Sequence, residues 1–197
     1  MAPPLLGGYR GICRSILPRR ARFALHCARS SGTFVNQPTA HVVLVNPEIP
    51  QNTGNIGRLV LCAGATLSLV GSLGFDISEK AVRRAGLDYW KNVPLHREPS
   101  VDAFFARIPA ERCFFLSKRG RLALQDVDFP AEPYVIFGGE SKGLPADLYD
   151  RYEERSVYVP TTDNVRSLNL ANCASVVLYH ILYRQGLLST LGRGAPG

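Results

Sequence analysis

The chain has 197 residues, of which 46% are apolar and 20% charged, so it is long enough for one domain with a buried core and too short for a multidomain assembly. This composition excludes a largely disordered chain, a collagen and a disulfide-rich scaffold. The formal net charge of +7 suggests a nucleic-acid binder, but six of the 23 basic residues precede residue 40, and the first acidic residue is Glu48. Subtracting these six from 23 leaves 17 basic residues against 16 acidic ones, so the remainder is close to neutral.

Residues 1–39 contain arginine but no lysine, aspartate or glutamate. An arginine-rich segment without acids is typical of a transit peptide, which the membrane potential draws into an organelle. We therefore expect a basic disordered arm that targets the protein to an organelle, the mitochondrion rather than the chloroplast because serine is sparse. The alternatives are an arm that touches RNA or an over-extended start codon, either of which would leave a cytoplasmic protein.

The first part of the domain alternates between strand and helix signals. Residues 41–45 form a short apolar, β-branched run that ends at Asn46-Pro47, which predicts a buried strand. A polar turn is expected over 48–55, followed by a helix from Ile56 to Gly64 with Asn52 or Thr53 as its cap. Residues 66–70 predict the next strand.

The same alternation continues to the end of the chain. Further strands are expected at 113–116, 134–137 and 157–159, and helices near 78–85, 100–106, 145–150 and 168–185. Strands that alternate with helices across short loops indicate an α/β fold with a parallel sheet. We assign residues 40–187 to this domain and residues 188–197 to a flexible tail. No stretch after the arm approaches the roughly 20 apolar residues of a membrane span, so no membrane partner is expected.

Three polar or glycine-rich segments follow predicted strands, where open parallel sheets bind ligands. In the first, 52–58, Asn55 and Arg58 share one helix face with Cys62, and an arginine on the first turn of a helix is well placed to bind a phosphate. A solvated arginine at a helix start explains this spacing equally well.

The second segment, 137–144, has the spacing G-G-x-x-x-G, which is neither the dinucleotide fingerprint nor a P-loop. Its glycines permit a ligand to approach the backbone or merely form a tight turn, and Glu140 needs a donor or cation as partner there. In the third, 159–172, Ser167 is expected to cap the last helix, with Asn169 and Asn172 at its start. Its polar density suits an adenosine-sized ligand, although capping alone is the simpler explanation.

The five cysteines are scattered and form no C-x-x-C pair, and no histidine lies at zinc spacing from any of them. We predict neither a disulfide framework nor a metal site. The four histidines offer no obvious catalytic base, because one lies in the arm and three lie outside the polar segments. These are His26, His41, His96 and His180.

Three motifs taken in order resemble those of the SPOUT RNA methyltransferases: N-T-G-N-I-x-R at 52–58, F-G-x-E-x-x-G-L at 137–144 and V-P-x(6)-S-x-N-L-A at 159–171. The segments 83–89 and 47–50 are similar to the small TrmL-type branch, the tRNA (cytidine/uridine) 2'-O-methyltransferases that act on the wobble nucleotide, position 34. The resemblance covers about residues 41–186. One departure is Gly139, where the family more often has proline or another residue, and we expect it to loosen the loop.

This resemblance implies a Rossmann-like parallel α/β domain with a C-terminal trefoil knot that binds S-adenosylmethionine. It also implies a homodimer whose active site is assembled across the subunit interface, with the anticodon stem-loop of tRNA as substrate. The cofactor-binding residues carried over are Leu116, Gly138, Val159, Ser167 and Leu168. The residues assigned to catalysis are Arg58, Asn55, Tyr179 and Glu140.

Methyl transfer to a ribose oxygen depends chiefly on alignment and on proton removal. A guanidinium has a pKa above ~12, so our hypothesis is that Arg58 fixes the RNA phosphate and the 2'-oxygen while the phosphate or a water accepts the proton. Asn55 is expected to form hydrogen bonds beside Arg58, and Glu140 to order the cofactor loop. Basic clusters expected to contact RNA, besides Arg58, are Arg83, Arg84, Lys118, Arg119 and Arg121.

Two other functions remain open at this point. The first is a SPOUT enzyme that methylates another RNA, such as ribosomal RNA, or a base nitrogen. The second is a non-catalytic RNA-binding protein on the same fold, which the intact polar motif residues disfavour. A dinucleotide-dependent oxidoreductase is excluded because no strand is followed by G-x-G-x-x-G with an acidic residue about 20 positions later.

Overall fold

The computed structural model describes residues 37–78, 87–165 and 167–192, and residues 36–197 form one compact unit. The arm expected over residues 1–39 lies almost entirely outside the described residues, and so does most of the helix expected near 78–85. A 3-10 helix, η5 (Leu187–Thr190), occupies the beginning of the segment that we expected as a tail.

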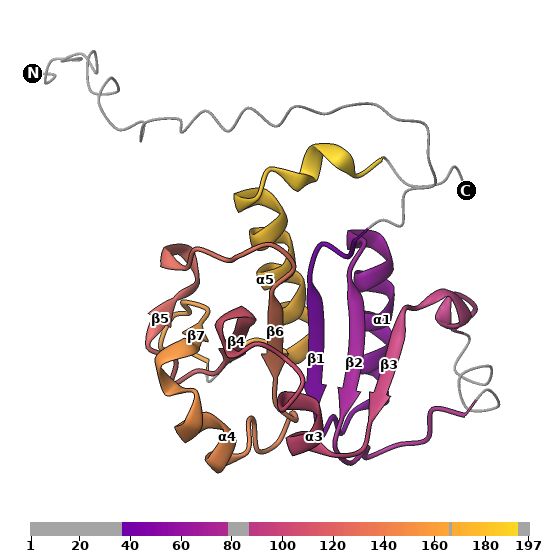
Figure 1. Cartoon of the computed structure of the whole chain (residues 1–197), viewed down its shortest axis with the longest axis horizontal. Coiled ribbons are helices and arrows are strands. Elements are labelled where there is room, and N and C mark those ends of the chain that lie inside the picture. The colour runs from indigo at the N-terminus through magenta and orange to yellow at the C-terminus, as the bar shows by residue number, and fades with distance from the viewer. Residues whose placement is uncertain (1–36, 79–86, 166, 193–197) are drawn as a thin grey trace, which may run out of the picture. The chain divides into compact units, whose positions relative to one another are not determined.

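Seven parallel strands form a single sheet in the order β3-β2-β1-β6-β4-β7-β5 (Figure 1). All five predicted strands are confirmed, β7 to within one residue at either end. The two strands that the sequence did not predict lie at the edges of the sheet, one polar and one only two residues long. The bounds are β1 (His41–Val45), β2 (Thr66–Val70), β3 (Leu95–Glu98), β4 (Cys113–Leu116), β5 (Leu122–Ala123), β6 (Tyr134–Phe137) and β7 (Ser156–Tyr158).

Helices cover both faces of the sheet (Figure 1). The long helices α1 (Pro50–Ala63) and α5 (Leu170–Arg184) pack against each other on one face, and the short helices α3 (Val101–Phe105) and α4 (Ala146–Arg151) lie on the other. Single-turn 3-10 helices occupy several connections: η1 (Trp90–Asn92), η2 (Ala110–Arg112), η3 (Leu124–Asp126) and η4 (Glu153–Arg155).

The apolar core is divided by the sheet because successive side chains of a strand point to opposite faces. In β1, Val42 and Leu44 join the cluster beneath α1 and α5, whereas Val43 and Val45 join the cluster beneath α3 and α4. Both faces of the central strands are therefore buried, which explains why these strands read as continuous apolar runs. The α/β prediction is confirmed.

The start of α1 differs from the prediction. The helix begins at Pro50, and its N-cap, Ile49, makes no side-chain capping bond. Proline suits the first helical position because the missing N–H would have no partner there. Asn52 and Thr53, which we expected as caps in a polar turn, are instead buried within the first turn of the helix.

The N-terminus of α5 also differs. Its cap is Asn169, whose side-chain oxygen accepts hydrogen bonds from the N–H groups of Ala171 at 2.9 Å and Asn172 at 3.3 Å. Ser167, the predicted cap, lies two residues earlier in the preceding loop. The prediction of a cap in this segment was correct, but the residue was wrong.

Candidate functional site

A cavity of about 920 Å³ lies at the carboxyl edge of the sheet. The loops that follow β4, β6 and β7 form its walls together with the first turn of α5, because parallel strands present their carboxyl ends at the same edge. Its size falls in the range of roughly 300–1,000 Å³ that is typical of pockets for drug-sized ligands. All five residues expected to bind the cofactor line it: Leu116, Gly138, Val159, Ser167 and Leu168.

The glycine loop after β6 folds back on itself. Gly143 has a left-handed conformation (φ +73°), and its N–H donates to the carbonyl of Gly139 at 2.8 Å. A Cβ added to Gly138 would collide with the backbone of Gly143 and Leu144, and one added to Gly139 would lie 2.6 Å from the carbonyl oxygen of Asn46. Gly139 thus permits close packing onto the end of β1, and our expectation that it loosens the loop was wrong.

A chain of hydrogen bonds joins all three polar segments. The Glu140 carboxylate accepts from the N–H of Glu48 at 2.8 Å and from the Asn52 amide nitrogen at 2.9 Å. Asn52 accepts in turn from the amide nitrogen of Asn169 at 3.0 Å, and Asn169 caps α5. Because each carboxylate oxygen of Glu140 has a donor, this arrangement supports a role in ordering the loop rather than in proton transfer.

Glu48, which lies just before α1, and Ser141 of the glycine loop make a second link that the sequence analysis did not predict. The Glu48 carboxylate accepts from the N–H of Ser141 at 3.3 Å and from its hydroxyl. These residues lie 93 positions apart, so no local spacing connects them. The available signals were the position of Glu48 shortly after a buried strand and its place in the segment 47–50, which is similar to the TrmL-type branch. Asn52 was also missed as a site residue, since we had treated it only as a cap.

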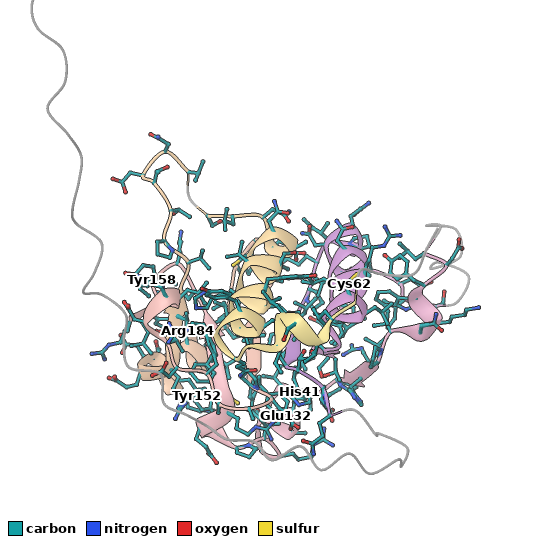
Figure 2. The ribbon with its side chains drawn as sticks, turned by 90° about the horizontal axis from the view of Figure 1, so that it is seen from above. His41, Cys62, Glu132, Tyr152, Tyr158 and Arg184 are labelled. Atoms are coloured by element: carbon teal, nitrogen blue, oxygen red, sulfur yellow. The ribbon has the colours of Figure 1, made fainter. Side chains whose placement is uncertain are left out.

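The residues assigned to the reaction itself lie outside this cavity. Asn55 and Arg58 are exposed on α1, together with Cys62 (Figure 2), so the predicted shared face is present. The guanidinium carbon of Arg58 lies 4.6 Å from the centre of the Tyr89 ring, an arrangement that favours a cation–π contact. Tyr179 lies on α5 and is 43% exposed. The chain therefore gathers the cofactor residues but does not bring Asn55, Arg58 and Tyr179 into their cavity.

Two glycines of α1 allow the segment that contacts Arg58 to pack closely on the helix. The Tyr89 hydroxyl donates to the carbonyl of Gly54 at 3.0 Å. Gly57 faces Trp90 so closely that an added Cβ would lie 2.6 Å from the indole ring. The two glycines therefore allow residues 89–90 to pack directly on the helix, which fixes the ring over which Arg58 lies.

Burial shifts the pKa values of two titratable groups of α5. Cys173 lines the cavity, and burial raises the pKa of its thiol to about 11, so it is not a thiolate nucleophile. Burial also lowers the pKa of His180 on α5, with a smaller contribution from Arg184. Among residues 37–78, 87–165 and 167–192, no group of three or more histidine, cysteine or acidic side chains could hold a metal ion. None of the described helices is both long and apolar enough to cross a membrane.

The SpoU rRNA Methylase family profile matches residues 39–179. A protein of Aeromonas hydrophila named tRNA (cytidine(34)-2'-O)-methyltransferase is 38% identical over 151 residues, which are 76% of this chain and 97% of that protein. A Listeria innocua relative that bears the same name provisionally is 45% identical over 150 residues, 74% of this chain and 88% of the relative. A solved structure presented as structural insights into the 2-OH methylation of C/U34 on tRNA superimposes with a TM-score of 0.69 at 39% identity, covering 75% of this chain and 96% of that one.

The fold and the site define an α/β protein with a ligand cavity at the carboxyl edge of a parallel sheet. The chain belongs to the SpoU methylase family. The predicted resemblance to SPOUT methyltransferases is thereby confirmed, and membership implies the C-terminal trefoil knot expected for such a domain.

Proposed function

We propose that this protein methylates the ribose 2'-oxygen of the wobble nucleotide of tRNA, cytidine or uridine at position 34, with S-adenosylmethionine as methyl donor. The observation that carries the proposal is the cavity in which all five expected cofactor residues meet. The names of the relatives supply the substrate, because two of them are called tRNA (cytidine(34)-2'-O)-methyltransferase.

The residues present fit the cofactor. The cavity combines apolar side chains, Leu116 and Leu168, with a glycine loop at which two positions leave no room for a Cβ. Apolar walls with a few fixed polar groups are typical of small-molecule sites. When bound, S-adenosylmethionine supplies an electrophilic methyl group. The Glu140, Asn52 and Asn169 hydrogen bonds hold the loops of the cavity in place around it.

The protein itself contributes the alignment of the two reactants and the positioning of the groups around the hydroxyl proton. Correct orientation of two reactants accounts for roughly 7–11 kcal/mol of a barrier. The ribose oxygen would form its bond to the methyl carbon as the bond from that carbon to sulfur breaks and S-adenosylhomocysteine leaves, and the hydroxyl proton would pass to an RNA phosphate or a water. Arg58 holds the phosphate and the 2'-oxygen in place, since a guanidinium presents N–H donors in a fixed planar arrangement.

Methylation of defined RNAs tests the function. The purified protein is incubated with methyl-labelled S-adenosylmethionine and either total tRNA or ribosomal RNA, and the products are mapped by nucleotide. We expect a 2'-O-methyl group at position 34 of a subset of tRNAs and none in ribosomal RNA. Methylation of ribosomal RNA alone, or of a base nitrogen, would contradict the proposal and favour another SPOUT activity.

We infer further that the protein acts as a homodimer that uses the outer face of α5. Val176, Tyr179 and Tyr183 recur at helical spacing on this face and are 45%, 43% and 70% exposed. Large apolar side chains gathered on one exposed helix face are typical of an interaction surface. A second subunit would also place Arg58 and Tyr179 near a cavity, which a single chain does not do. Light scattering coupled to size-exclusion chromatography tests this, with a dimer mass expected.

For residues 1–39 we propose mitochondrial targeting, supported by their arginine content and lack of acids. A fluorescent fusion of the full chain should enter mitochondria, and a fusion that lacks these residues should stay in the cytoplasm. In the purified protein, deletion of residues 1–39 should leave tRNA binding intact. Loss of tRNA binding on deletion would instead identify the arm as an RNA-binding element.

A further inference from the structure

Most cations of the described domain have a partner within the protein. Five arginines form ion pairs with carboxylates, and two more donate to backbone carbonyls. The first group comprises Arg107, Arg112, Arg121, Arg151 and Arg184, and the second Arg97 and Arg155. Arg121, which we expected to contact RNA, is paired with Glu154. These charges are therefore largely satisfied within the molecule.

Three of the five exceptions among the described residues line the cavity, and the other two, Arg58 and Lys91, do not. Within the part of the chain that the structure describes, Lys91, Lys118 and Lys142 have no hydrogen bond or ion pair with another residue. Lys118 and Lys142 come from different loops, yet both line the cavity and both are exposed. Arg119 lies beside Lys118, also lines the cavity and has no carboxylate partner among the described residues. Three cationic residues without an ion-pair partner among the described residues therefore line one cavity, which the acidic Glu140 and Asp163 also line.

The loop that carries Lys118 and Arg119 is a fixed turn. The N–H of Gly120 donates to the carbonyl of Ser117 at 2.9 Å, and the N–H of Ser117 donates to Val157 of β7 at 2.9 Å. Gly120 packs so closely on β7 that a Cβ would collide with the backbone of Val157.

Tyr149 of α4 fixes the same turn from the other side. Its hydroxyl donates to the carbonyl of Arg119 at 2.6 Å, and its ring lies 4.5 Å from the Arg119 guanidinium carbon. Lys118 and Arg119 therefore occupy the central positions of a turn that is fixed by contacts with β7 and with Tyr149. The backbone of such a turn loses little further conformational freedom when its side chains bind a ligand.

The loop that carries Lys142 is fixed as well. The Gly143 to Gly139 hydrogen bond closes it, and Ser141 donates to the Glu48 carboxylate. Lys142 stands between these two anchored residues. Two independently fixed turns thus present lysines at the same opening.

We propose that Lys118 and Lys142, with Arg119 beside them, bind backbone phosphates that flank the nucleotide to be methylated. This inference rests on the proposed function and names the contacts that its RNA makes. A lysine binds phosphate as a point charge, and a polyanion suits several uncompensated cations. S-adenosylmethionine carries a net positive charge, so these cations do not favour the whole cofactor. Its carboxylate is the other anion that they could contact, and the measurement of cofactor affinity distinguishes the two.

The test compares Lys118→Gln, Lys142→Gln and the double variant with Lys91→Gln. Lys91 is a matched control because it is also exposed and without a partner but does not line the cavity. Affinity for tRNA is measured over a series of salt concentrations, and affinity for S-adenosylmethionine by calorimetry. We expect substitution of either cavity lysine to weaken tRNA binding several-fold. Each substitution should also reduce the slope of log affinity against log salt concentration by about 0.7–0.9. The affinity for S-adenosylmethionine and the behaviour of Lys91→Gln should match the wild type.

Two results would overturn the inference. In the first, the cavity variants keep the wild-type tRNA affinity and salt slope. In the second, they lose affinity for S-adenosylmethionine but not for tRNA, which would assign the lysines to the cofactor carboxylate. If the proposed function is wrong, the wild-type protein will not modify position 34. The affinities of the lysine variants can then be measured with the RNA that the wild type does methylate, so the two failures are distinguishable. A wild type that binds no RNA would contradict both.

Discussion

The cavity at the carboxyl edge of the sheet and the outer faces of α1 and α5 differ in how complete they are within one chain. The cavity contains every residue expected to bind the cofactor, and hydrogen bonds from Glu140 through Asn52 to Asn169 tie its loops together. The outer faces carry Arg58 and Tyr179, both exposed and outside the cavity.

This difference separates two tasks. Under the proposed assignments, binding of the cofactor requires only groups that one chain already positions, whereas the reaction requires groups that one chain leaves apart. A substitution at the outer faces should therefore lower turnover without changing the affinity for the cofactor. A substitution in the hydrogen-bonded loops should lower the affinity for the cofactor without directly changing the chemical step.

The largest effect is expected for Arg58→Lys. Lysine keeps the positive charge but loses the planar pair of donors that binds phosphate, and it also loses the stacking geometry over Tyr89. We expect kcat to fall by about 10²–10³, the range for removal of one donor that stabilises a transition state. Calorimetry should show unchanged affinity for S-adenosylmethionine. Near-full turnover would show that bidentate geometry does not matter.

A charge on the outer face of α5 should have the next largest effect. Val176→Glu places a carboxylate where the proposed dimer requires an apolar contact, so the dimer should dissociate and turnover should fall by more than tenfold. Ala106→Glu is a matched control, since Ala106 is exposed at the end of α3 in the opposite helical layer. Sedimentation velocity measures the assembly state. A monomeric variant with full activity would show that one chain is sufficient.

The two regions also differ in how far the sequence predicts them. The strands of the core were predicted because β-branched apolar runs such as residues 41–45 are buried on both faces. β3 was missed because its sequence, Leu-His-Arg-Glu, is polar and lies at the exposed edge of the sheet. The start of α1 was misplaced because asparagine is a common N-cap residue, whereas the side chain of Asn52 donates a hydrogen bond to Glu140.

Long-range pairings mark the limit of what the sequence predicts. The Glu48 to Ser141 contact joins residues 93 positions apart, and nothing local specifies it. In the same way, spacing identified Arg121 as a candidate RNA contact, but only the fold shows that Glu154 neutralises it while Lys142 stays without a partner among the described residues. Which charges are free depends on tertiary neighbours rather than on sequence position.

Glu140→Gln tests the cavity side of the comparison. The substituted amide keeps one acceptor but presents a donor to either the Glu48 N–H or the Asn52 amide, so one of these donors loses its partner. Hydrogen bonds to charged groups contribute about 1.5–3 kcal/mol, and we expect affinity for S-adenosylmethionine to fall about tenfold, near the lower end. Glu154→Gln is the control because Glu154 is exposed and, among the residues that the structure describes, its carboxylate pairs with Arg121 alone. Normal cofactor affinity without turnover would reassign Glu140 to the chemical step.

The smallest effect is expected at the amino edge of the sheet, which carries neither function. His41 stacks on Tyr134 with ring centres 4.1 Å apart, and its Nδ1 lies 2.8 Å from the Thr66 hydroxyl. Burial lowers the pKa of His41 from 6.5 to about 4; the positive charge of Arg112 and a smaller effect of His96 add to this, while Glu132, which lies nearby (Figure 2), opposes it.

Between these two pH values the unfolded chain binds a proton at His41 that the folded chain does not, so the free energy of unfolding should decrease as the pH falls from about 6.5 to 4. His41→Gln should flatten this part of the profile, measured as the difference between the urea unfolding curves of variant and wild type. Cofactor affinity at pH 7 should be unchanged, because His41 lies at the edge of the sheet opposite the cavity. An identical pH dependence in both proteins would show that the pKa of His41 is the same in the folded and the unfolded chain, and a loss of cofactor affinity would show that the two edges are coupled.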